Sequence, residues 1–166
     1  MPVYLLTLHA YRSWRPDHPK GYVRQGEGIL PPDAEMAAQY DRNATHRQVT
    51  FDKELQQILV EGTCDICDRR DWRLHYVATE PTHIHALVSW LDDTLDWKFV
   101  HDTLKRLLGM MLAQHTRTKG RKWFVRKGSR KRVRDCGHFE YLMNEYLPKH
   151  SGRRWSERAA DCARSQ

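Results

Sequence analysis

The strongest constraint on the fold is a pair of alternating segments, residues 72–80 and 83–90, that are joined by a short turn. In the second segment, Ile84 and every other residue after it is apolar or aromatic, whereas His83 and His85 fall between them. Side chains of a strand point to opposite faces in turn, so the apolar set faces one side of a sheet and both imidazoles face the other. The Glu-Pro-Thr sequence between the segments is typical of a turn, which predicts a hairpin.

The patterns on both sides of this hairpin predict the remaining fold. The expected elements are a strand at residues 3–9, a helix from about 52 to 70, the two hairpin strands, a helix over about 96–115, a strand at 122–126 and a helix over about 136–147 that ends at Pro148. This order is the split β-α-β-β-α-β arrangement followed by one more helix. The sequence therefore predicts a ferredoxin-like α+β fold with an antiparallel sheet, in a single domain spanning residues 1–166.

Residues 11–49 differ from the rest of the chain, because they combine several prolines and glycines with no sustained period. They are predicted to form a long irregular insertion with one short helix near residues 33–40. Loops of this length in compact domains are usually functional or partly disordered.

The charge of the chain favours a polyanionic partner. The formal net charge is +7 and the pI is about 9.4, and the basic residues gather in the last third of the sequence. The residues expected to hold a DNA backbone are Lys119, Arg121, Lys122, Arg126, Lys127, Arg130, Lys131, Arg132 and Arg134. A plain alternative is a solvated basic loop. No stretch reaches the roughly 18 apolar residues that span a bilayer, so a soluble, cytoplasmic protein is expected.

Two groups of residues could hold a metal ion. A Cys-x-x-Cys pair, Cys64 and Cys67, lies in a predicted helix, but Cys136 and Cys162 do not supply the second pair that a structural zinc site needs. By contrast, two neutral imidazoles one residue apart on a strand face can share a divalent cation. The alternative is two histidines on the solvated face of a half-buried strand.

The last helix carries two tyrosines that helical spacing separates. Tyr146 falls on an apolar stripe with Phe139, Leu142 and Met143, so it is assigned to the core. Tyr141 lies on the opposite side, one turn from Glu145. If that side faced the histidine strand, a phenol and a carboxylate would join the two imidazoles.

Taken together, these residues resemble the single-tyrosine transposases of the HUH superfamily, above all the REP-associated tyrosine transposases. His83-Ile84-His85 is similar to the family's His-hydrophobic-His motif, and Tyr141 matches its nucleophile on the helix after the last strand. The early segment from Ser13-Trp14-Arg15-Pro16-Asp17 to Lys20-Gly21 resembles a Trp-Leu-Pro-Gly-Asp and Arg-Gly stretch of the REP-associated group. Nearly the whole chain takes part in the resemblance.

The resemblance implies metal-assisted cleavage of single-stranded or hairpin DNA through a covalent 5′-phosphotyrosine, by a homodimer. It implies Tyr141 as the nucleophile and His83, His85 and Glu145 as ligands of Mg²⁺ or Mn²⁺, although imidazole would also accept zinc. Glu145 stands where many relatives carry an asparagine or a metal-binding glutamine, so the third ligand is the least supported part of the assignment.

Other functions stay open. A relaxase or replication initiator of the same superfamily shares the histidines and the tyrosine but usually brings a further domain that 166 residues cannot contain. A histidine-triad hydrolase requires a histidine at position 87, which is Leu87. A non-catalytic, structure-specific DNA-binding protein with the same fold and basic surface is the alternative from another functional class.

Overall fold

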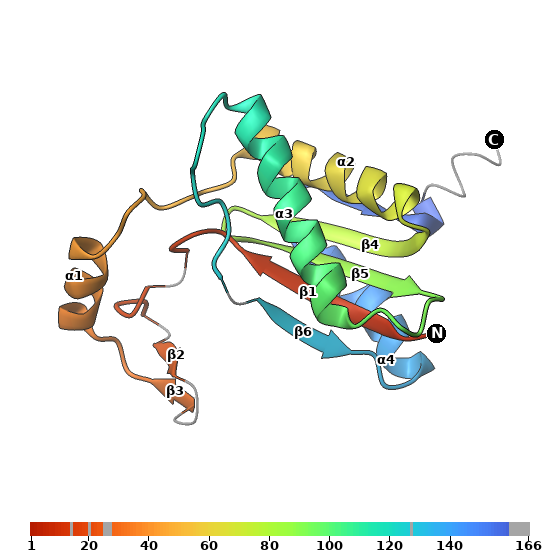
Figure 1. Cartoon of the computed structure of the whole chain (residues 1–166). Coiled ribbons are helices and arrows are strands. Elements are labelled where there is room, and N and C mark those ends of the chain that lie inside the picture. The colour runs from red at the N-terminus through yellow and green to blue at the C-terminus, as the bar shows by residue number, and fades with distance from the viewer. Residues whose placement is uncertain (14, 20, 25–27, 127, 160–166) are drawn as a thin grey trace.

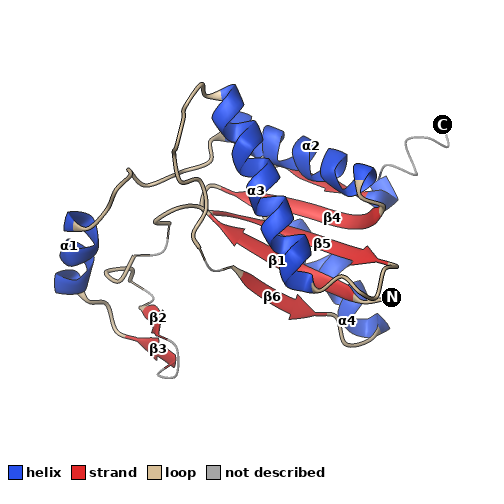
Figure 2. Cartoon of the chain, viewed as in Figure 1, coloured by secondary structure: helices blue, strands red, loops and turns tan. Residues whose placement is uncertain are grey.

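The computed structural model is built on one five-stranded antiparallel sheet, with two long helices on one face and a shorter helical segment on the other (Figures 1 and 2). The structure describes residues 1–13, 15–19, 21–24, 28–126 and 128–159. Its elements are β1 (Val3–His9), β2 (Tyr22–Arg24), β3 (Gly28–Leu30), α1 (Ala34–Arg42), α2 (Lys53–Arg69), β4 (Trp72–Glu80), β5 (His83–Trp90), α3 (Trp97–His115), β6 (Ser129–Arg132), α4 (Cys136–Tyr141), the π-helical turn η1 (Leu142–Tyr146), the 3-10 turn η2 (Leu147–Lys149) and β7 (Arg154–Ser156).

The strands of the sheet lie in the order β6-β1-β5-β4-β7, and every pair is antiparallel. Four of these strands form the split β-α-β-β-α-β arrangement, in the chain order β1, α2, β4, β5, α3, β6. The predicted ferredoxin-like α+β fold is thus confirmed. β7 adds a fifth strand beside β4 that the sequence analysis missed.

The two long helices begin where the sequence indicates. The carboxylates of Asp52 and Asp96 accept hydrogen bonds from the backbone N–H groups of Leu55 and Phe99, which caps the first turns of α2 and α3. Both helices cover the same sheet face, as Figure 1 shows, and bury the apolar set of β5 that begins at Ile84. The imidazoles of that strand therefore lie on the opposite face.

A second, smaller core covers part of that opposite face. Leu142, Met143 and Leu147 of the C-terminal helical segment pack against Leu5 of β1 and Leu87 of β5. In Figure 1 this segment lies behind the sheet, on the side away from α2 and α3. The additional C-terminal helix that the sequence predicted thus lies on the histidine face.

The prediction of a strand at residues 122–126 is wrong. Trp123 and Phe124 are buried in the main core, and only Phe124 pairs with the sheet, through an isolated bridge to Ala10. The edge strand β6 instead consists of exposed polar and basic residues, which have no apolar pattern to reveal a strand. Charged side chains on an edge strand oppose pairing with other chains, so the composition of β6 suits its position.

Residues 11–49, which we call the N-terminal arm, contain more order than the sequence predicted. The expected short helix is confirmed as α1, whose N-cap Asp33 accepts a hydrogen bond from Met36 N. The small hairpin of β2 and β3 was not predicted, because each strand has three residues. Figure 1 shows α1 and this hairpin beside the end of the sheet rather than on either face. Trp14 and Lys20 lie outside the described residues.

No helix in the described ranges is both long and apolar enough to cross a membrane.

Polar contacts of Glu157, the residue after β7, link the end of the described chain to β4. Glu157 accepts hydrogen bonds from His75 Nδ1 at 2.7 Å and from Arg73 Nε at 2.8 Å, and His75 Nε2 contacts Ser89 Oγ at 2.8 Å. Burial opposes ionisation of Glu157, but the hydrogen bonds from His75 and Arg73 outweigh it and hold the carboxyl pKa below its ordinary value.

We expect Glu157→Gln to lower the melting temperature at neutral pH. A depressed pKa contributes stability above the unfolded value of about 4.3, and this contribution is lost as the pH falls through the folded pKa. The difference in melting temperature between wild type and variant should therefore shrink below about pH 4. Thermal melts from pH 8 to pH 3 test this, and a difference that stays constant over the range would contradict it.

Candidate functional site

The register of β1 and β5 places His83 and His85 at the end of the sheet on the face away from the long helices. His85 lies opposite Thr7 and His83 lies opposite His9. The two imidazole rings of β5 have centroids 4.7 Å apart. This arrangement agrees with the prediction that both side chains share one face and converge.

A third imidazole completes the group. His150 follows η2, and its ring centroid lies 4.7 Å from that of His85 and 5.8 Å from that of His83. Each of the three residues offers one ring nitrogen, and these nitrogens all lie within 4.8 Å of one another. Among the described residues, this is the group of histidine, cysteine and carboxylate side chains that could hold a metal ion.

The second nitrogen of each ring has its own partner. His85 Nδ1 contacts Thr7 Oγ1 at 2.8 Å, His83 Nδ1 contacts Thr82 Oγ1 at 3.0 Å, and His150 Nδ1 lies 3.1 Å from the carbonyl oxygen of Leu147. A carbonyl only accepts, so Nδ1 of His150 carries the proton and Nε2 has a free lone pair. Partners of this kind orient metal-ligating histidines and fix their tautomer.

Burial and mutual repulsion keep the two strand imidazoles, His83 and His85, neutral. Burial, together with the neighbouring His9 and His150, lowers the pKa of His83 to about 4. Burial and the same neighbours, with His83, lower the pKa of His85 to about 3. Neutral imidazoles are the form that binds a metal, so the donor set fits a divalent cation near neutral pH.

Tyr146 is the tyrosine that reaches the histidines. Its hydroxyl lies 3.4 Å from His85 Nε2, and its ring contacts those of His85 and His150 at centroid distances of 5.6 and 5.2 Å. Burial, and then the neighbouring Tyr141, raise the pKa of the Tyr146 phenol above its ordinary value. Tyr141 is half exposed, and its ring lies 6.4 Å from that of Tyr146.

The side of the last helix that lies against the histidines is the one that carries Tyr146, not the side with Tyr141 and Glu145 that the sequence predicted. The apolar stripe that ends in Tyr146 was correctly identified, since Phe139, Leu142, Met143 and Tyr146 all contact the second core. That core lies on the histidine face of the sheet, so the end of the stripe meets the imidazoles. The opposite side of the helix, with Tyr141 and Glu145, faces solvent.

Glu145 is accordingly not part of the metal-binding group. Its side chain is 62% exposed and pairs with Lys149 at 3.7 Å. His150 takes the position that the sequence analysis gave to Glu145. Its spacing could have revealed it, because His150 follows Tyr146 by four residues, about one helical turn. The sequence analysis ended the helix at Pro148, whereas Pro148 lies within the 3-10 turn η2.

The described basic residues divide between several surfaces instead of forming one track. Lys131 lies opposite Leu5, on the histidine face, and lines a cavity of about 440 Å³ with His83, His85 and Tyr146. Arg130 also lines this cavity, but its guanidinium stacks over Trp97, 3.9 Å from the ring centroid, on the face that α3 covers.

The remaining predicted DNA contacts lie farther along the chain. Arg121 stacks on Trp123 and Lys122 lies over the Tyr11 ring, at centroid distances of 4.6 and 5.9 Å. Lys119, Arg126, Arg132 and Arg134 are exposed, and Lys127 lies outside the described residues.

The chain has a structural similarity to a known protein, although its sequence alone finds none. No protein-family model and no curated protein matches the sequence. Among solved structures, the chain is similar to that of a REP-associated tyrosine transposase bound to a REP hairpin, with 10% sequence identity and a TM-score of 0.49. The alignment covers 99% of this chain and 81% of the other.

We expect His150→Ala to abolish most of the stabilisation that a bound metal gives, because a third of the donor set is lost. A cation at a hundredfold excess over its Kd raises stability by about 2.7 kcal/mol. Thermal melts with and without Mn²⁺ measure this shift for wild type and variants. Glu145→Gln is the matched control and should keep the shift, and an equal loss in both variants would return Glu145 to the ligand set.

Proposed function

We propose that the chain cleaves single-stranded DNA by transesterification, with Tyr146 as the nucleophile and His83, His85 and His150 as the metal ligands. The observation that carries this proposal is the Tyr146 hydroxyl, which lies 3.4 Å from His85 Nε2 beside three convergent imidazoles. The resemblance of the His-x-His strand to that of HUH transposases supports the same reaction class. The nucleophile and the third ligand are changed from Tyr141 and Glu145 because the geometry favours the new pair.

In the proposed reaction, the phenolic oxygen of Tyr146 attacks a backbone phosphorus and the bond from phosphorus to the 3′ oxygen breaks. The tyrosine gives up its proton, the leaving 3′ oxygen takes one, and a 5′-phosphotyrosine remains. The number of phosphoester bonds is unchanged, so a 3′-hydroxyl can later reverse the step without ATP. When bound, a divalent cation supplies positive charge that stabilises the phosphate and favours the phenolate.

The ligand set bears on the choice of cation. Without Glu145 the donors are three imidazoles, which suit Zn²⁺ better than Mg²⁺ or Mn²⁺. The chain orients these rings through Thr7, Thr82 and the Leu147 carbonyl, and it keeps Tyr146 beside them. Lys131, in the same cavity, is suited to a phosphate of the strand. A homodimer stays a prediction.

Substitution of each tyrosine tests the nucleophile. Tyr146→Phe should keep its packing on the second core and lose the covalent adduct, because phenylalanine has no oxygen to attack phosphorus. Tyr141→Phe is the matched control on the same helix and should form the adduct at close to the wild-type rate. The measurement is a denaturing gel of each protein incubated with single-stranded and hairpin DNA and Mn²⁺, with thermal melting as the folding control.

If Tyr141→Phe lost the adduct and Tyr146→Phe kept it, Tyr141 would be the nucleophile. If wild type binds DNA but forms no adduct with Mn²⁺, Mg²⁺ or Zn²⁺, the non-catalytic DNA-binding protein becomes the better assignment.

The role of Lys131 can be measured through the salt dependence of binding. Lys131→Ala should weaken DNA binding uniformly across sequences and reduce the slope of log affinity against log salt by about 1, since one phosphate contact is lost. Lys53→Ala, an exposed position at the start of α2, removes the same charge from the other face of the sheet and should leave the slope unchanged. Equal slopes for all three proteins would exclude Lys131 as a phosphate contact.

A further inference from the structure

The N-terminal arm encloses a second cavity that the proposed chemistry does not use. It has a volume of about 560 Å³, which lies within the range of pockets that hold small ligands. Three tyrosines, Tyr11, Tyr22 and Tyr40, line it together with Arg12, Arg15 and Arg126. We call it the arm cavity.

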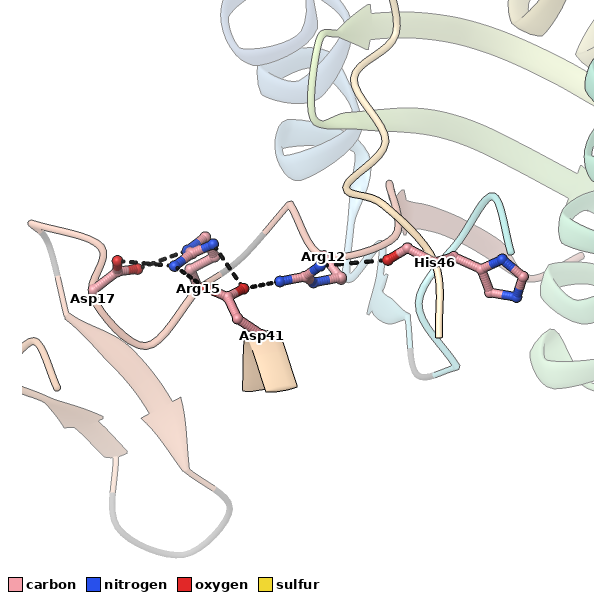
Figure 3. A network of polar contacts seen from close by, with 5 residues as sticks. All are labelled: Arg12, Arg15, Asp17, Asp41 and His46. Atoms are coloured by element: carbon pink, nitrogen blue, oxygen red, sulfur yellow. Dashed lines mark hydrogen bonds and ion pairs between the residues drawn. The ribbon is translucent and has the colours of Figure 1, made fainter. Parts of the chain in front are cut away.

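A network of ion pairs holds two of these arginines, Arg12 and Arg15, in place, as Figure 3 shows. Arg15 pairs with Asp17 through Nε and Nη2 at 3.0 and 3.2 Å, and with Asp41 of α1 through Nη1 and Nη2 at 3.1 and 3.0 Å. Arg12 pairs with the same Asp41 and donates to the carbonyl oxygen of His46 at 3.4 Å. The network links the loop after β1 to α1.

The charges of this network determine what the cavity suits. Two guanidinium groups and two carboxylates sum to zero, so the network has no net attraction for a phosphate. Arg15 uses four of its five N–H groups in the four hydrogen bonds to Asp17 and Asp41. Its planar face remains for stacking, as do the tyrosine rings. The part of the cavity that this network lines therefore suits a neutral, planar, heteroaromatic group better than an anion.

The arm cavity adjoins the candidate active site. His9 lines the cavity of His83, His85 and Tyr146, and Tyr11 lines the arm cavity, so at most about 7 Å of chain separates the two lining residues. Two backbone hydrogen bonds fix this junction, from Ala10 N to the Thr82 carbonyl and from Tyr11 N to the Trp123 carbonyl, both at 2.8 Å. A DNA strand bound at the histidines would therefore lie next to the edge of the arm cavity.

We propose that the arm cavity binds one unpaired nucleobase of the DNA strand that Tyr146 cleaves. The base stacks on the tyrosine rings and the arginine face, and the exposed Arg126 at the rim contacts a flanking phosphate. This inference rests on the proposed function, because that function supplies the strand. It adds a protein contact that reads the single-stranded part of the substrate beside the scissile bond.

Tyr40 is the best position for a test, because its side chain is 58% exposed and its loss should not disturb the core. The probe is a fluorescent DNA hairpin with a short single-stranded extension, and a series of copies each carries one abasic site in that extension. Affinity is measured by anisotropy with a chelator present, so that binding is observed without cleavage. Tyr40→Phe keeps the ring, and Phe99→Ala removes a comparably exposed ring of α3 that lies outside the cavity.

The expected result is coupling between Tyr40 and one nucleotide. Tyr40→Ala should bind the intact probe roughly tenfold more weakly, and wild type should lose a similar factor at one abasic position. The Tyr40→Ala variant should lose nothing further at that position. Tyr40→Phe and Phe99→Ala should bind as wild type does, and all four proteins should melt at similar temperatures.

Three outcomes would overturn the proposal. They are wild-type affinity in Tyr40→Ala, equal abasic losses in wild type and Tyr40→Ala at every position, and a loss in Phe99→Ala as large as in Tyr40→Ala. Adduct formation with no coupling would reject the base-binding cavity and leave the cleavage proposal intact. Coupling without any adduct would reject cleavage and support base binding.

Discussion

The antiparallel register between β1 and β5 is the constraint on which the candidate site depends. It sets Thr7 opposite His85 and His9 opposite His83. The Thr7 hydroxyl therefore contacts the His85 ring, and the His9 ring lies beside that of His83. A slip of one residue would turn both histidines toward α2 and α3, because strand side chains alternate between faces. The apolar set beginning at Ile84 prevents such a slip, since it is buried beneath those helices.

The second core makes the other half of the site. Leu142, Met143 and Leu147 hold the C-terminal segment against the histidine face, and this packing delivers Tyr146 and His150 to the two strand histidines. A π-helical turn at residues 142–146 and a 3-10 turn at 147–149 carry the chain through this stretch. Such irregular turns often occur at functional sites. The same burial keeps His83 and His85 neutral, so packing and ligand chemistry act in the same direction.

The N-terminal arm is held together by polar contacts near the surface, whereas the sheet is held by a buried apolar core. Its ion pairs are exposed or half-exposed, and pairs of that kind contribute little stability, of the order of 0–1 kcal/mol each. Their value lies in orientation, since Asp41 holds two guanidinium groups at once and joins α1 to the loop after β1. Anchoring comes from the ends of the arm, where Val49 N donates to the Tyr11 carbonyl and Phe51 is fully buried. An arm built in this way suits binding better than it suits the support of the core.

The sequence by itself determined the elements whose patterns are local. Alternation defined β4 and β5 and placed His83 and His85 on one face, and apolar spacing defined α2 and α3. The order of these elements predicted the ferredoxin-like fold. Only the tertiary structure decided which side of the last helix meets that face, and so brought Tyr146 and His150 to the site in place of Tyr141 and Glu145. A helical stripe records that a face is buried but not against what, because burial is non-directional. Likewise, edge strands β6 and β7 owe their pairing to backbone groups of β1 and β4, and backbone hydrogen bonds leave no pattern in the side chains.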